Sequence, residues 1–278
     1  MRRGIFAAPY ALWMILFTVC PMIFVVYYAF TTVSGSFTLE NLIACSDPSY
    51  LKAIYLSLKL AVECTVICLV LGYPAAYFLA SKDFSKHQML FILILLPMWM
   101  NFLLRTYAMM SMLERRGVIT ALLGMLGFEN VELNILGTNA AVLLGMVYNF
   151  LPFMILPIHT SLKKMDSRVI EAAQDLGASP MRVFSKVTLP LSLPGVVSGI
   201  TMVFMPSVTM FAISRLLGEG NIRLIGDWIE DKFLRTTTSE VVNGWGVGST
   251  LSLFMLILII ISIWLLNKID PKHEEGGK

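Results

Sequence analysis

The residues whose types and spacing point most directly to a chemical task lie in one polar stretch between two apolar segments. The stretch reads Glu171-Ala-Ala-Gln-Asp-Leu-Gly177, and after nine further residues comes Val187-Thr-Leu-Pro190. Glu171 offers a carboxylate to a cationic partner, and the small Ala172 and Ala173 allow another protein to approach closely. A membrane-buried chain has no structural need for this insert, so the pattern indicates a surface that a partner outside the membrane binds.

Local rules predict two short helices in this stretch. Residues 168–176 are good helix formers, and Gly177 stands where a helix can end in the left-handed conformation. Ser179 precedes a proline, which is typical of an N-cap followed by the first helical residue, so a second helix is predicted over 180–187. Leu189-Pro190 is expected to stop this helix and return the chain to the membrane.

The chemistry of an enzyme is missing from the sequence. There is no Gly-x4-Gly-Lys-Ser/Thr loop to hold phosphates, so ATP hydrolysis would need a separate polypeptide. The three histidines are widely spread, and the four cysteines have no metal-type spacing. The chain is therefore expected to have no catalytic residues, no metal site and no cofactor of its own.

The composition is that of an integral membrane protein. Of the 278 residues 57% are hydrophobic and only 14% are charged, against about 25% charged in soluble domains. A helix that crosses about 30 Å of hydrocarbon needs about 20 apolar residues. Runs of this length cover 5–30, 54–80, 89–113, 138–162, 191–216 and 248–267. They predict an all-α protein with six transmembrane helices, in one membrane domain over 1–278.

The basic residues predict the orientation of these spans. With six spans, both termini and the 163–190 loop share one side of the membrane. Twelve lysines and arginines fall on that side: Arg2, Arg3, Lys82, Lys86, Lys163, Lys164, Arg168, Arg182, Lys186, Lys268, Lys272 and Lys278. Six fall on the other: Lys52, Arg115, Arg116, Arg223, Lys232 and Arg235. The positive-inside rule therefore predicts cytoplasmic termini, and the net charge of +3 reflects this bias and does not indicate a nucleic-acid partner.

The polar stretch resembles the EAA signature of bacterial ABC-importer permeases, which is Glu-Ala-Ala, three residues, Gly, nine residues and Ile-x-Leu-Pro. Val187 stands where that family usually has isoleucine. The resemblance implies a type I importer permease fold in a multi-pass protein of the bacterial cytoplasmic membrane. It also implies that the 163–190 loop is a pair of coupling helices that docks on an ATPase, which uses the ATP and Mg²⁺. The implied coupling residues are Glu171, Ala172, Ala173, Asp175, Gly177, Leu189 and Pro190.

Four further segments, 71–80, 96–107, 151–157 and 224–226, look like the permease subunits of spermidine/putrescine importers, and the B-type subunit most closely. This resemblance implies a second homologous permease, a dimer of ATP-binding subunits and an extracytoplasmic polyamine-binding protein. Relatives that carry iron, sulfate or opines share parts of these segments, so an importer of another small solute stays an alternative. An ion-gradient carrier also fits broken helices and buried charges, but the 163–190 loop and the lack of an internal repeat disfavour it.

Polar and aromatic residues in and above the spans are candidates for a polyamine path, because cations favour acidic groups and aromatic faces. The candidates are Trp99, Asn101, Tyr107, Tyr148, Asn149, Asp227 and Glu230. Trp99 and Tyr107 would lie about two turns apart on one face of a single helix. Glu63 is the one acid within a span, and it can either serve function or pair with Lys59, four residues earlier. Arg105 and Arg215 are expected to anchor the chain at an interface or to pair with a carboxylate of the second permease.

Overall fold

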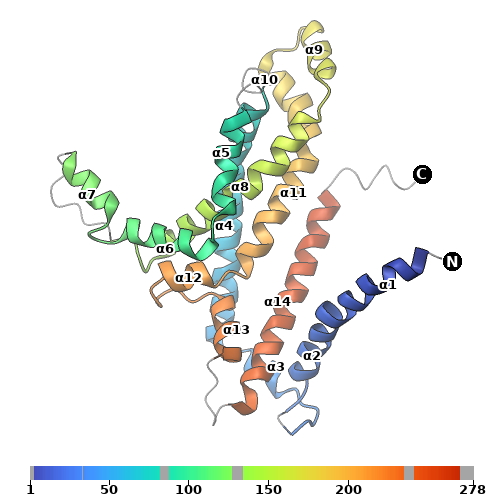
Figure 1. Cartoon of the computed structure of the whole chain (residues 1–278), viewed down its shortest axis with the longest axis vertical. Helices are drawn as coiled ribbons and strands as arrows, with labels where there is room; N and C mark the ends of the chain where they lie inside the picture. The colour runs from blue at the N-terminus through green and yellow to red at the C-terminus, as the bar shows by residue number, and fades with distance from the viewer. Residues whose placement is uncertain (1–2, 33, 82–87, 127–133, 235–240, 270–278) are drawn as a thin grey trace. The chain divides into compact units, whose positions relative to one another are not determined.

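A computed structural model describes residues 3–32, 34–81, 88–126, 134–234 and 241–269. Within these ranges all the named secondary-structure elements are helices (Figure 1). The predicted all-α class is confirmed. The chain divides into two compact units, residues 1–55 with 224–260 and residues 56–223 with 261–278. The long helices α4 (Pro48–Ala80) and α14 (Val241–Ile269) each contribute residues to both units. A single permease domain over 1–278 stays a prediction.

Five helical stretches in the described residues are long and apolar enough to cross a membrane, or six if one bent pair is a single span. They are Pro9–Ala29, Pro48–Ala80, Asn139–Lys163, Pro180–Val208 and Gly244–Leu266, with Phe91–Trp99 and Phe102–Met125 as the bent pair. Each of the six predicted apolar runs falls on one of these stretches, so composition located the spans. The structure changes the third and the fifth.

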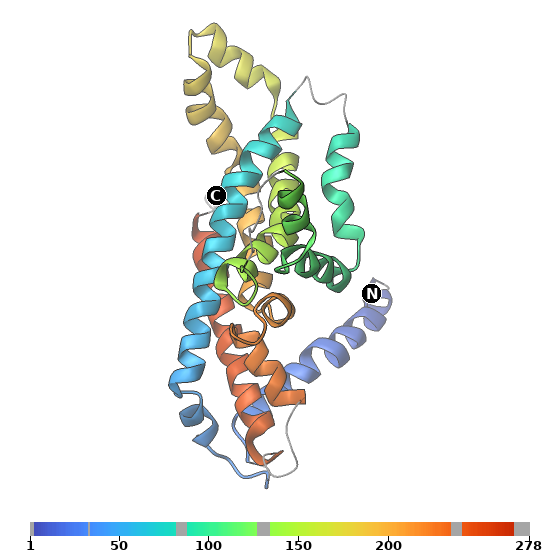
Figure 2. The same cartoon turned by 90° about the vertical axis from the view of Figure 1, so that its left-hand side faces the viewer.

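The third span is not one straight helix. α5 (Gln88–Trp99) and α6 (Phe102–Leu113) meet at a bend of 102°. α5 ends two residues after Pro97, which lacks a backbone N–H and so removes one hydrogen bond from the last turns of the helix. Figure 2 shows α6 crossing the end of α5 at a steep angle. The expectation that a single helix covers 89–113 is therefore wrong, although the bent pair can still form one span. Residues beyond α6 continue into α7 (Val118–Met125).

The fifth span begins earlier and ends earlier than predicted. α10 (Pro180–Val183), the π-helical turn η3 (Phe184–Thr188) and α11 (Leu189–Val208) form one uninterrupted helical stretch. Pro190 does not stop the helix, contrary to the prediction, because it follows the widened π turn, which accommodates the missing N–H. The same arrangement occurs in the first span, where the π turn η1 (Ile15–Val19) ends two residues before Pro21. A break after Val208 separates α11 from α12 (Ala212–Leu217).

The core of the unit 56–223 is the close contact of α8 (Asn139–Lys163) with α11. A Cβ on Gly195 would lie 2.5 Å from Ser161 Cβ and 2.8 Å from the Pro157 carbonyl oxygen. Only glycine therefore permits the two backbones to approach this closely. The predicted fourth span over 138–162 is confirmed as α8, whose N-cap Thr138 accepts a hydrogen bond from the Ala141 N–H.

Within the unit formed by 1–55 and 224–260, Asn41 on α3 (Glu40–Ala44) lies at a close contact of three helices. The buried Asn41 side chain donates to the carbonyl oxygens of Ala29 at 3.1 Å and Thr31 at 3.2 Å, at the end of α2 (Cys20–Ala29). A Cβ on Gly246 of α14 would meet the same amide at 2.5 Å. The side chain of Asp47 caps α4 by accepting from the Ser49 N–H at 2.7 Å, which lowers the pKa of Asp47.

Candidate functional site

The polar stretch singled out in the sequence folds as a helical hairpin, formed by α9 (Ser167–Asp175) and α10, which we call the α9–α10 hairpin. α9 begins at its N-cap Asp166, whose carboxylate accepts from the Arg168 N–H at 3.0 Å. In Figure 1 the hairpin extends beyond the adjoining ends of α8 and α11. The two predicted helices are confirmed, apart from the end of the second.

Gly177 ends α9 with the left-handed backbone that the sequence predicts, at a φ of +78°. The Gly177 N–H donates to the Gln174 carbonyl at 2.8 Å, and the Ala178 N–H donates to the Ala173 carbonyl at 3.1 Å. This pair of bonds is the Schellman motif, which satisfies the last carbonyls of a helix. No atom lies within 4 Å of the position that a Cβ would take on Gly177. The requirement for glycine therefore comes from the backbone angle alone.

The second arm of the hairpin continues into η3, and η3 packs against α4. The Phe184 ring packs edge-on against Tyr73 and Tyr77, with ring centroids 5.9 Å and 5.6 Å apart. One turn deeper, the Tyr73 hydroxyl forms a hydrogen bond of 2.9 Å with Ser192 of α11. Because α10 runs into α11 without interruption, a displacement of α10 would act directly on α11.

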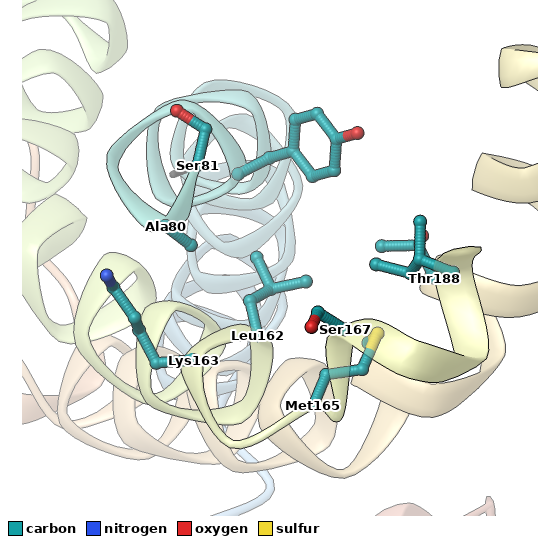
Figure 3. A pocket seen from close by; sticks show the side chains of 9 residues that line it. Ala80, Ser81, Leu162, Lys163, Met165, Ser167 and Thr188 are labelled. Atoms are coloured by element: carbon teal, nitrogen blue, oxygen red, sulfur yellow. The ribbon is translucent and has the colours of Figure 1, made fainter. Parts of the chain in front are cut away.

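The first arm lies over a cavity of about 390 Å³. Its lining comes from the end of α4, the end of α8, the start of α9 and Thr188 of η3, as Figure 3 shows. Ser167 and Ile170 of α9 lie in this lining, so the inward face of α9 is not packed solidly against the helices below it. The hairpin therefore has one arm fixed to the bundle and one arm above open space.

The predicted coupling residues lie at the surface of the hairpin and at the start of α11. Glu171, Ala172, Asp175, Gly177 and Pro190 are exposed, Leu189 is 37% exposed and Ala173 is half-buried. Sequence reasoning missed three apolar side chains beside them. Val169, Leu176 and Met181 are 45%, 89% and 72% exposed. Val169, Ala172 and Leu176 follow the i, i+3, i+7 spacing of one helical face, and this apolar stripe in a polar loop was the available signal.

Trp99, Asn101 and Tyr107, three of the path candidates, are placed at the bend of the third span. Trp99 is the last residue of α5 and is 82% exposed, whereas Tyr107 lies on α6 and is 53% exposed. The expectation that they share one helical face is wrong, because the bend separates them. Asn101 is the N-cap of α6, and its side-chain oxygen accepts from the N–H groups of Leu103 and Leu104.

Tyr148 and Asn149, on α8, already have partners within the chain. The guanidinium of Arg105 lies over the Tyr148 ring, 5.8 Å from its centroid. Asn149 is 1% exposed and donates to the Gly145 carbonyl at 2.8 Å, while its side-chain oxygen is buried without a hydrogen-bond partner. Only Tyr148, at 44% exposure, therefore presents a surface to a passing solute.

Asp227 and Glu230, the two acidic candidates, belong to α13 (Ile225–Leu234) in the other compact unit. Asp227 is 4% exposed, and its carboxylate accepts from the Leu224 N–H at 2.8 Å. It therefore caps the start of α13. Glu230 is half-buried on the same helix.

The structure also shows the surroundings of three charged residues whose roles the sequence did not decide, Glu63, Arg105 and Arg215. Lys59 Nζ and Glu63 Oε1 are 3.9 Å apart, so the structure shows the pairing that was one of the two alternatives for Glu63. Arg105 is buried within the chain and donates to the Pro97 carbonyl at 2.7 Å. It is not an anchor at the membrane surface. Arg215 lies half-buried in the last turn of α12.

Known proteins resemble this chain over most of its length. Residues 68–274 match the family described as binding-protein-dependent transport system inner membrane component. The chain is 36% identical over 260 residues to a spermidine/putrescine transport system permease protein PotB of Haemophilus influenzae, covering 91% of this chain and 88% of the relative. It is 35% identical over 272 residues to PotB of Escherichia coli K12, covering 95% and 97% of the two chains.

Solved structures share the fold. A chain of a bacterial ABC transporter involved in the import of the acidic polysaccharide alginate superposes with a TM-score of 0.74 at 15% identity, covering 94% of this chain and 92% of that one. A second structure of a bacterial alginate ABC transporter, in complex with a periplasmic protein that holds an alginate pentasaccharide, gives the same TM-score at 14% identity over 97% and 93%.

Proposed function

Because this chain belongs to the family of binding-protein-dependent transport system inner membrane components, we propose that it is the membrane permease of an ATP-driven importer of spermidine and putrescine. The family makes it a multi-pass inner-membrane protein and the non-catalytic membrane component of an ABC importer, which works with a binding protein and an ABC partner. Membership of this family sets aside the ion-gradient carrier.

The observation that carries the substrate class is the identity of 35–36% to PotB permeases over at least 91% of this chain. The alginate transporters, at 14–15% identity, support only the fold. The exposed tryptophan and tyrosines of the 97–107 and 148 region suit a cation, since aromatic faces attract ammonium groups. Asp227 gives less support to a cationic substrate, because its buried carboxylate already caps the start of α13.

The α9–α10 hairpin is the proposed contact with the ATPase. It combines an apolar stripe (Val169, Ala172 and Leu176) with the carboxylate of Glu171 on the same short helix. Exposed apolar residues gathered beside charged ones are typical of a protein-binding surface. A movement of this surface would pass through α10 and η3 into α11, since the three form one helical stretch.

The proposed assembly contains a second, homologous permease, a dimer of ATP-binding subunits and an extracytoplasmic polyamine-binding protein. ATP and Mg²⁺ are bound by the ATPase in this proposal. Large apolar side chains of the spans, such as Leu93, Leu104 and Ile257, are more than half exposed in the single chain and are available to lipid or to the second permease.

Reconstitution tests the proposed function. The affinity-tagged chain is isolated from its native membrane with its accompanying subunits and placed in liposomes with ATP inside. We expect ATP-dependent accumulation of labelled spermidine or putrescine when the binding protein is added outside. Omission of ATP should abolish it. If ferric iron, an opine or sulfate accumulates instead and neither polyamine does, the related importer of another solute is the correct function.

Cysteine labelling tests the proposed orientation, in which both termini and the α9–α10 hairpin face the cytoplasm. In a cysteine-free background, a membrane-impermeant maleimide applied to intact spheroplasts should label Ser34→Cys and not Ser179→Cys. Both positions are exposed, so neither is protected by the fold. Permeabilised cells should label both. Labelling of Ser179→Cys alone in intact spheroplasts would reverse the orientation and remove the ATPase contact from the hairpin.

A further inference from the structure

The segment 96–107 contains a corner, formed by residues Pro97 to Arg105, that the proposed function does not yet use. The helices on its two sides are bent by 102° relative to each other. In Figure 1, α6 leaves the end of α5 in a different direction. Such a corner leaves backbone groups without helical partners, namely the last carbonyls of α5 and the first N–H groups of α6. Within a bilayer, each of these groups needs a partner from the protein.

Two side chains four residues apart supply these partners from opposite directions. Asn101 Oδ1 accepts from the Leu103 N–H at 2.9 Å and from the Leu104 N–H at 3.3 Å, which caps the start of α6. Arg105 Nη1 donates to the Pro97 carbonyl oxygen at 2.7 Å, and this oxygen, near the end of α5, also accepts from the Met100 N–H at 3.2 Å. The residue that begins the corner and the residue that closes it are thus joined by a direct hydrogen bond.

Arg105 is too buried for an ordinary surface contact. It is 6% exposed, its guanidinium lies 5.8 Å from the centroid of the Tyr148 ring, and its Nε is buried without a hydrogen-bond partner. No carboxylate pairs with Arg105 in the part of the chain that the structure describes. A buried cation without a carboxylate is costly. The hydrogen bond to Pro97 and the contact with Tyr148 of α8 are the interactions that offset this cost for Arg105.

We propose that Asn101 and Arg105 are positioning residues for transport, which hold α5 and α6 at a fixed corner and thereby orient Trp99. Trp99 lies between Pro97 and Asn101, and it is 82% exposed because α5 ends there and α6 leaves in another direction. Arg105 also ties the corner to α8 through Tyr148. The role in transport rests on the proposed function, whereas the role in holding the corner does not.

The corner itself is tested by a distance between spin labels on Leu93 of α5 and Met112 of α6, in the assembled complex in liposomes. Both side chains are exposed, at 61% and 44%. Nineteen residues of straight helix would separate the backbones by about 28 Å, whereas two arms bent by 102° leave about 20 Å. We expect the short distance in the otherwise unchanged protein and a longer or broader distribution in Arg105→Met, which keeps the apolar stem and loses the donors.

Transport is tested with paired variants at each position. Arg105→Met and Asn101→Ala should lower the rate of polyamine uptake at least fivefold. Arg105→Lys, which keeps a cationic donor group, and Asn101→Ser, which remains an N-cap, should recover at least half of the rate. Basal ATP hydrolysis should stay within twofold, because the α9–α10 hairpin is untouched. The matched control is Arg115→Met, an exposed arginine whose Nε donates to Asn134 at 3.2 Å, and it should transport normally.

The outcomes separate this inference from the proposed function. Unchanged distances and unchanged uptake in both Arg105→Met and Asn101→Ala overturn it. If Arg105→Met does not assemble, the contrast between Asn101→Ala and Asn101→Ser decides, and equal uptake in these two counts against it. If the unchanged protein moves no polyamine, the proposed function fails, and the spin-label distances still decide whether Arg105 holds the corner.

Discussion

Replacing Gly177 with valine is expected to abolish the stimulation of ATP hydrolysis by the loaded binding protein and to lower uptake more than tenfold. Gly177 has a φ of +78°, where a β-branched side chain is strained. Backbone strain of this kind costs about 1–3 kcal/mol, and α9 is a short helix that lies over a cavity. We expect the helix end to rearrange instead of bearing this strain. Glu171 and the apolar stripe would then no longer face the ATPase together.

The control for this variant uses the same position. Asparagine tolerates the left-handed conformation, and no atom lies within 4 Å of the added Cβ. Gly177→Asn should therefore keep stimulated ATP hydrolysis within about twofold of the unchanged protein. Gly124→Val on α7 should do the same, because the space around Gly124 is also open but its φ is negative. Stimulated ATPase rates and uptake are measured on complexes of equal subunit composition. Normal stimulation and uptake in Gly177→Val would remove the coupling role from this glycine.

The hairpin could be predicted in detail because its determinants are local. Gly177 ends α9 in the left-handed conformation as predicted, and Ser179-Pro180 begins α10 as predicted, although the Ser179 side chain forms no capping hydrogen bond. The Asp166 cap of α9 is equally local, since its carboxylate accepts from the Arg168 N–H. The apolar stripe was missed for a related reason. Val169 and Leu176 matter through their exposure, and the exposure of a side chain depends on which neighbouring helices cover it.

The corner could not be predicted because proline alone does not decide where a membrane helix breaks. Pro74, Pro152 and Pro157 lie inside helices that continue past them. α5 instead ends two residues after Pro97, and α11 ends two residues after Pro206. At Pro97 the distinguishing feature is the pair of partners for the freed backbone groups, Asn101 and Arg105. In the sequence, these two residues read as path-lining or interface groups, since a hydrogen bond between positions 97 and 105 exists only once the chain has turned.

The aromatic residue at this corner leads to the second large effect. If the permease passes polyamines, each ammonium group must exchange water for protein groups as it enters the membrane, since an uncompensated charge there is costly. Trp99 offers the largest exposed aromatic face at the corner, at 82% exposure, whereas one side of the Tyr148 ring is already covered by Arg105. A desolvated cation–π contact contributes up to about 2 kcal/mol and is strongest with tryptophan. We therefore expect Trp99→Ala to lower the uptake of labelled spermidine about tenfold, and Trp99→Phe to lower it less.

The competing explanation is that Trp99 anchors the chain at the membrane interface, where tryptophan is common. Trp264 provides the matched control, because it is 62% exposed near the end of the sixth span and its ring lies 5.7 Å from Lys268 Nζ. Trp264→Ala removes an exposed tryptophan at a site with no proposed substrate contact. This variant should transport normally when its abundance in the membrane equals that of the unchanged protein. Competition by unlabelled spermidine then tests the cation directly, since a lost contact should raise the concentration that gives half-maximal uptake. Unchanged uptake in Trp99→Ala, or an equal loss in Trp264→Ala, would assign Trp99 to the interface and not to the substrate.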